Sequence, residues 1–310
     1  MACFQNATYF RLQKAFAVLF CMYRYIINQN KRRNGMQATD LLKKTDKLPN
    51  VPDVVRELIQ LLSDPNVKYS DLTERVSHDQ TISLKVLRVV NSAYFGLSRK
   101  ISSIDEATVL LGTDKLKTLV IASGFSNSVA KVEGLNLNEF WADSFRVAEL
   151  AQWFAKRTPL VEVDEAFTAG IVHNIGRLLL HLTEPAIAQE IQSLVANRKA
   201  GRVKAEQDLL GFTTQDAGKA LMDLWKFPAG LGYAVQHHKR PFSDNEPNPL
   251  ACVLNLACYI NACIRNERDY DLVREGFPSA VAKAAGLPEG VIYELDDALA
   301  IGDGLNQLLH

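Results

Sequence analysis

Apolar side chains recur at helical spacing along most of this sequence, and that pattern restricts the fold more than any other feature. From Val51 to Leu62 they fall at offsets of 0, 3, 4, 7, 8, 10 and 11 residues, the period of one helix face. Pro52 lies in the first turn, where proline favours a helix start. A β-strand would show polar and apolar residues in alternation, with many β-branched side chains. No stretch of six residues in the sequence sustains this pattern. The sequence therefore predicts an all-α fold.

Other segments repeat this spacing, and turn signals separate them. Pro228 ends one helix and opens the next, which carries His237 and His238. No fixed repeat of 30 to 50 residues is present, so a helical solenoid is not expected. The further helices are predicted at 70–78, 81–92, 105–111, 114–122, 139–156, 164–181, 185–198, 216–225, 250–264, 278–285 and 290–309.

Composition narrows the class of protein. The hydrophobic fraction of 47% is enough for a sizeable core. Lys plus Arg and Asp plus Glu are 35 each, so the formal net charge is zero and no nucleic-acid partner is indicated. The five cysteines are odd in number and show no CxxC spacing. These features predict reduced thiols and a cytoplasmic protein.

One N-terminal segment leaves alternatives open. Ala15–Tyr23 is an unbroken apolar run of nine residues, too short for a transmembrane helix. It fits the apolar region of a signal peptide, although no small-x-small cleavage site follows. It also fits a packing or peripheral amphipathic helix. A third interpretation is that translation starts at Met36, in which case the first 35 residues would be an extension of the gene model and no part of the native protein.

Three of the six histidines stand in informative contexts. His173 lies in GIVHNIGR and is followed by the neutral Asn174, where a carboxylate would favour a metal site. His237 and His238 lie in AVQHHKRP, and neighbouring side chains on a helix diverge by about 100°. One of the pair can then face a pocket while the other flanks it. Taken alone, the pair fits metal ligands or histidines that cap a helix end.

An ordered series of motifs resembles the HDOD domain over about residues 45 to 265. It includes LPNVP at 48–52, NSAYFG at 91–96, SIDEATVLLG at 103–112, AGIVHNIGRLLL at 169–180 and AVQHHKRP at 234–241. The resemblance implies a multi-helix HD-like bundle with an N-terminal helical lobe. It also implies an extension over 1–44, an HDOD domain over 45–245, and C-terminal helices over 246–310 that pack on the HD-like lobe.

The same resemblance relates this chain to the HD and HD-GYP metal-dependent phosphohydrolases. Their ligand positions fall on side chains that differ from the enzymes' set in four places. Without the charge of a carboxylate at Asn174, a bridging metal and a metal-activated water are not expected. The resemblance thus implies a vestigial pocket with no catalytic residue and no cofactor. Its residues are Asp143, His173, Asn174, Thr214, His237, His238 and Cys258.

Metal binding stays open as an alternative. A divalent ion such as Fe, Mn, Zn or Ni would be held by His173, His237 and His238, or by a rearranged set in which Asp143 and Cys258 join His173 and His237.

The NSAYFG element has two interpretations. Asn91, Ser92, Tyr94 and Phe95 form a candidate binding surface at a helix end. The same residues also fit a cap, core aromatics and a glycine helix stop at Gly96. The sequence does not separate the two.

For function, the resemblance implies a non-catalytic bacterial signal-transduction module. Its expected partners are signalling proteins, second-messenger enzymes among them, and a nucleotide or cyclic dinucleotide is a candidate ligand. The alternative is a metal-dependent phosphohydrolase that acts on a nucleotide or cyclic dinucleotide with an altered ligand set.

Overall fold

The computed structural model describes residues 36–43, 73, 74, 76, 77, 80–91, 97–112, 116, 132–225, 227–243 and 246–301. Every regular element in these ranges is a helix, and their one β-type pairing is an isolated bridge between Val132 and Leu135. The predicted all-α fold is confirmed. The helix predicted at 51–62, and most of that at 114–122, lies outside the described residues.

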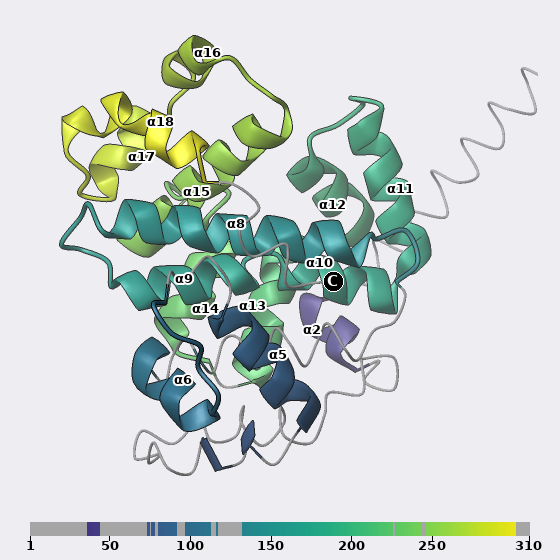
Figure 1. Cartoon of the computed structure of the whole chain (residues 1–310). Coiled ribbons are helices and arrows are strands. Elements are labelled where there is room, and N and C mark those ends of the chain that lie inside the picture. Colours follow the sequence, from purple (N-terminus) through teal and green to yellow (C-terminus); the bar gives the residue numbers. More distant parts are fainter. Residues whose placement is uncertain are drawn as a thin grey trace, which may run out of the picture.

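From α8 onward the helices follow one another mostly with short connections (Figure 1). Their bounds are α2 (Ala38–Leu42), α5 (Gln80–Val90), α6 (Ile104–Leu111), α8 (Leu137–Ala155), α9 (Val163–Val172), α10 (Ile175–Thr183), α11 (Pro185–Ala196), α12 (Arg202–Leu210), α13 (Thr214–Leu224), α14 (Ala229–His237), α15 (Pro249–Arg265), α16 (Tyr270–Glu275), α17 (Ser279–Ala284), the 3-10 helix η3 (Glu289–Tyr293) and α18 (Leu295–Leu299).

Helix α8 forms the centre of the bundle, and Figure 1 shows it crossing the middle of the molecule. Its start is capped by Asn136, whose Oδ1 accepts hydrogen bonds from two backbone N–H groups of the first turn. Packing against α9 on one side and α15 on another buries most of its apolar residues, including Leu150 and Phe154. Because α8 is buried on two sides, apolar residues occupy most of its positions.

The sequence predicted one helix over 164–181, and the structure corrects this to two. Helix α9 ends at Val172, and α10 begins at Ile175. The two halves pack against different partners, α9 on α8 and α10 on α13. A Cβ at Gly170 would overlap the backbone of Ala148, and one at Gly176 would overlap the backbone of α13. The close approach of α9 to α8 at Gly170 and that of α10 to α13 at Gly176 therefore lie on either side of the break at His173 and Asn174.

Helices α10, α13, α14 and α15 enclose the remaining space beside α8. Helix α13 begins with a capping box, in which Thr213 and Asp216 satisfy each other's backbone N–H groups. It packs on both α10 and α14, and α14 packs on α15. This arrangement brings the turn between α9 and α10 close to α8 and α15.

The weakest parts of the prediction lie where apolar residues are sparse. Helix α12 was not predicted, because its buried positions are only Ala205, Glu206 and Leu210. The short α16 was also missed. The helix expected at 290–309 is a 3-10 turn followed by the short α18, and residues 302–310 lie outside the described ranges.

Helix α2 belongs to the segment predicted as an N-terminal extension. It packs against α13, and the side chain of Leu41 is fully buried. Within the described residues, no helix has the length and apolar character needed to cross a membrane.

Candidate functional site

A cavity of about 300 Å³ lies where α8, α10, α12, α13 and α15 meet the turns that follow α9 and α14. Four of the seven predicted pocket residues line it, namely Asp143, His173, Asn174 and Cys258. The other three, Thr214, His237 and His238, are not part of its lining. The structure thus gathers part of the predicted set and separates the rest.

His173 and Asn174 occupy the break between the two helices, as the last residue of one and the residue before the other. The His173 Nδ1 atom lies 2.7 Å from the carbonyl oxygen of Gly170. Because a carbonyl only accepts, this contact places the ring hydrogen on Nδ1 and leaves Nε2 without one in the neutral ring. The buried His173 ring is therefore fixed by local backbone at the wall of the cavity.

The two adjacent histidines take different positions. His238 is fully buried, with its Nδ1 atom 2.7 Å from the carbonyl oxygen of Val235, and its ring meets that of His173 edge to face at 5.7 Å. Burial lowers the pKa of His238, which favours the neutral ring. The half-buried His237 stacks its ring on Tyr233 at 4.0 Å. Only His238 of this pair joins His173.

Cys258 of α15 lies beside both buried rings. Burial alone would raise the pKa of its thiol, but the positive charge of Lys239 and the interactions with His173 and His238 hold that pKa well below its ordinary value. Relative to an ordinary cysteine, this shift favours the thiolate form at the wall of the cavity.

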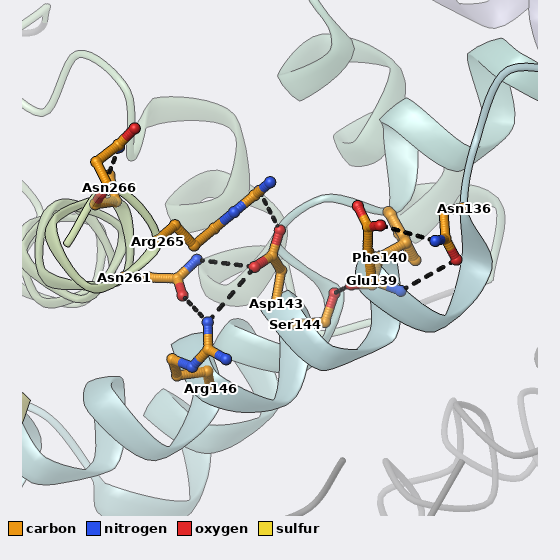
Figure 2. Close-up of polar contacts among 10 residues, drawn as sticks. Asn136, Glu139, Phe140, Asp143, Ser144, Arg146, Asn261, Arg265 and Asn266 are labelled. Atoms are coloured by element: carbon orange, nitrogen blue, oxygen red, sulfur yellow. Dashed lines mark hydrogen bonds and ion pairs between the residues drawn. The ribbon is translucent and has the colours of Figure 1, made fainter. Parts of the chain in front are cut away.

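Asp143 is held by α15 from across the cavity. Its Oδ2 accepts a hydrogen bond of 2.5 Å from Arg265, and its Oδ1 lies 3.5 Å from the Asn261 amide and 3.8 Å from Arg146 (Figure 2). Arg146 also donates to Asn261 at 3.0 Å. The carboxylate is thus engaged by cationic and amide donors that join α8 to α15.

Thr214 is engaged with a carboxylate that the sequence did not single out. Its backbone N–H and its hydroxyl each donate to Glu206 at 2.9 Å. Glu206 is fully buried and forms an ion pair with Arg202 at 3.6 Å. A buried carboxylate needs such partners. The one sequence signal was the four-residue spacing of Arg202 and Glu206, which is common on exposed helix faces.

The residues present do not fit a divalent metal centre. In the described ranges, no group of three or more His, Cys, Asp or Glu side chains is placed to hold an ion. His237 points to Tyr233, so His173, His237 and His238 do not converge. Asp143 is bound to Arg265, and the neutral Asn174 supplies no charge.

Basic side chains dominate the charged lining of the cavity. They are Arg177, Arg202, Lys239 and Arg265, whereas Asp143 is the lone carboxylate of the lining. Sequence reasoning missed this because the four are scattered along a chain of zero net charge. The available signals were the basic residues that end HNIGR and follow the histidine pair.

Asn91, from the candidate binding surface, has a structural role. Its amide donates to the carbonyl oxygens of Leu87 and Ile101 at 2.8 and 2.7 Å, and its Oδ1 accepts from the N–H of Ile101 at 2.6 Å. These bonds tie the end of α5 to the segment before α6. Ser92, Tyr94 and Phe95 lie outside the described residues.

Comparison with protein families and solved structures agrees with this architecture. The HDOD domain model matches residues 48–241. A candidate phosphohydrolase from Shewanella amazonensis SB2B is 34% identical, with a TM-score of 0.73 over 89% of this chain and 99% of that chain. An HDOD domain protein of unknown function from Geobacter sulfurreducens is 23% identical, with a TM-score of 0.69 over 88% and 97% of the two chains.

One sequence relative is named for an activity. The cyclic di-GMP phosphodiesterase CdgJ of Vibrio cholerae is 29% identical over 140 residues, which are 44% of this chain and 31% of CdgJ. This chain spans less than half the length of the sequence relatives that it matches.

Proposed function

The chain belongs to the HDOD family, and on that premise we propose that it is a non-catalytic signal-transduction module that acts by binding a signalling protein. The observation that carries the proposal is the state of the positions where related phosphohydrolases hold metals. Asn174 is neutral, Thr214 is bonded to Glu206, and Asp143 is paired with Arg265. Each of these side chains is committed to the fold or lacks charge.

These side chains do not meet the requirements of metal-assisted hydrolysis. That reaction needs a cation to lower the pKa of a bound water and to stabilise charge on the phosphoryl oxygens. An amide at Asn174 cannot neutralise such a cation, and the guanidinium at Asp143 already occupies the carboxylate. The site therefore favours recognition over turnover.

The alternative of a metal-dependent phosphohydrolase has one observation in its favour. His173 and His238 meet at 5.7 Å beside Cys258, and both rings direct Nδ1 to backbone carbonyls. Two imidazoles and a thiolate are ligand types for zinc. The names of the Shewanella and Vibrio relatives point the same way, but the family pattern at Asn174 and Thr214 weighs against it.

Metal content and turnover together separate the two functions. The full chain would be expressed with added Fe, Mn, Zn and Ni, purified without chelators and measured by elemental analysis. It would then be assayed on bis-nitrophenyl phosphate and cyclic di-GMP with added Mn²⁺, beside a catalytic HD-type enzyme. We expect substoichiometric metal and no turnover. One ion per chain, with turnover that His173→Ala abolishes, would replace the proposal by the enzyme.

The binding of a signalling protein needs its own test. The tagged full chain and an unrelated tagged protein of similar size would each be used to capture proteins from a native bacterial lysate. Enrichment of a defined signalling protein, reproduced with the two purified proteins, is expected. The absence of any protein enriched over the control would count against this part of the proposal.

A further inference from the structure

We infer that the cavity bounded by α8, α10, α12 and α15 binds a small phosphate monoester, and that Arg177 is its main charged contact. The inference deepens the proposed function, because it names a ligand class for the same non-catalytic site.

The charge of the cavity lining points to an anion. Its four basic side chains face one carboxylate, a surplus of three positive charges. If Cys258 is counted as a thiolate, the surplus is two. Just outside the lining, Glu206 and Arg146 carry opposite charges and cancel. This local excess contrasts with the zero formal charge of the whole chain, so the basic residues are concentrated at the site.

The basic residues differ in whether the fold already uses them. Arg265 is paired with Asp143 at 2.5 Å, and Arg202 is 3.6 Å from Glu206. The Arg177 side chain has no hydrogen bond or ion pair in the described part of the chain, and its Nε atom is buried without a partner. Arg177 therefore keeps its donors for a group that enters the cavity.

The surroundings of Arg177 make an empty cavity costly. Burial lowers the pKa of Arg177 to about 10, and the positive charges of Arg202 and Arg265 act in the same direction. A partly buried cation beside other cations destabilises the fold unless an anion compensates it. A dianion in the cavity would offset two of the surplus positive charges and supply acceptors for the Nε and Nη hydrogens.

The geometry and size favour a phosphate monoester over a cyclic dinucleotide. A guanidinium presents parallel donors that match two phosphate oxygens, and a monoester carries close to two negative charges at neutral pH. A cavity of about 300 Å³ lies at the lower end of small-molecule sites. Asn174, Gln215 and Asn261 add amide groups to the lining, suited to hydroxyl or base-edge contacts.

Calorimetric titration of the full chain with inorganic phosphate, AMP, GMP and cyclic di-GMP tests the inference. We expect saturable binding of phosphate or a monoester, weakened by added NaCl, and binding of cyclic di-GMP at least about tenfold weaker. Absence of saturable binding for every compound would overturn the inference. Tighter binding of cyclic di-GMP than of the monoesters would overturn the assigned ligand class.

Two variants make the assignment to Arg177 specific. Arg177→Gln is expected to weaken binding at least about tenfold and to raise the melting temperature of the ligand-free protein, because an uncompensated buried charge is removed. Arg240→Gln, which changes an exposed arginine outside the lining, should leave affinity nearly unchanged. Unchanged affinity for Arg177→Gln would refute the role of Arg177. Lower stability of the ligand-free variant would indicate a structural arginine instead.

The result of the ligand-binding test can be separated from the result of the test of catalysis. If phosphate compounds bind and are also turned over, the non-catalytic function fails and the ligand assignment stands. If there is neither metal nor turnover and no phosphate compound binds, the ligand assignment fails and the non-catalytic function stands.

Discussion

The Arg265 guanidinium donates to the Asp143 carboxylate at 2.5 Å, and this contact joins the end of α15 to the middle of α8 across the mouth of the cavity. The carboxylate side chain is 15% exposed and that of Arg265 is 50% exposed. The pair therefore lies at the boundary between solvent and the pocket. It fixes a side chain that the resemblance to the HD phosphohydrolases places at a metal-ligand position.

Removing either partner of this pair should change ligand affinity in opposite directions. Asp143→Asn deletes the one carboxylate of the lining, so phosphate should bind more tightly, whereas Arg265→Gln should weaken binding. Because the Arg265 side chain is 50% exposed, Arg265→Gln should cost only about 1 kcal/mol of unfolding free energy, whereas Asp143→Asn should cost more because that side chain is only 15% exposed. Calorimetry and urea denaturation of both variants and of the double variant measure the coupling. Changes of affinity in the same direction would contradict the electrostatic account.

Glu206 should be far more important for stability than its place on a polar helix suggests. Glu206→Gln places an amide donor opposite the N–H and hydroxyl donors of Thr214, and it leaves Arg202 without its charge partner. A loss of about 2 to 4 kcal/mol of unfolding free energy is expected. Asp208→Asn on the same helix removes only the exposed pair with Lys204 and should change stability by less than about 1 kcal/mol. Urea denaturation of both variants decides whether burial of the carboxylate is the cause.

The elements that could be predicted from the sequence are those whose buried face is strongly apolar. Helices α8, α13 and α15 follow this rule, because each has buried apolar residues at helical spacing. Examples are Leu150 in α8, Leu221 in α13 and Leu254 in α15. Helix α12 does not, because the polar Glu206 is one of its few buried residues. Burial of a charged side chain depends on partners elsewhere in the chain, and the local sequence does not identify them.

The site was predicted in part for a similar reason. The position of His173 followed from its motif, but the break in the helix after it depends on tertiary packing. The basic lining depends on bringing together Arg177, Arg202, Lys239 and Arg265 from separate segments. Spacing along the chain carries no information about that convergence. The role of Asn91 at the end of α5 likewise depends on a contact ten residues away.

The close contact at Gly176 should be required for the shape of the site. A Cβ at this position would overlap the backbone oxygen of Thr214 and approach the backbone of Gly218. Gly176→Ala would therefore push α10 from α13, with an expected loss of about 1 to 3 kcal/mol of unfolding free energy. Gly201→Ala, where an added Cβ meets nothing within 4 Å, is the matched control. Equal stability of the two variants would show that the helices can separate without cost.

Two cysteines of α15 should differ sharply in reactivity. The positive charge of Lys239 and the contacts with His173 and His238 outweigh burial and hold the pKa of Cys258 well below the ordinary thiol value, whereas burial raises the pKa of Cys252 to about 11. The reactive species is the thiolate. Cys258 should therefore be alkylated by iodoacetamide at neutral pH, and Cys252 should not.

The pH dependence follows from the same shifts. As the pH falls from 9 to 7, an ordinary thiol loses most of its thiolate, but Cys258 should keep its labelling rate until the pH approaches its own lowered pKa. Peptide mass spectrometry after timed alkylation measures both sites in one sample, with Cys252 as internal control. Lys239→Gln removes the largest stabilising charge and should shift the labelling profile of Cys258 to higher pH. A profile for Cys258 that follows an ordinary thiol, or one that Lys239→Gln leaves in place, would contradict this view of the cavity wall.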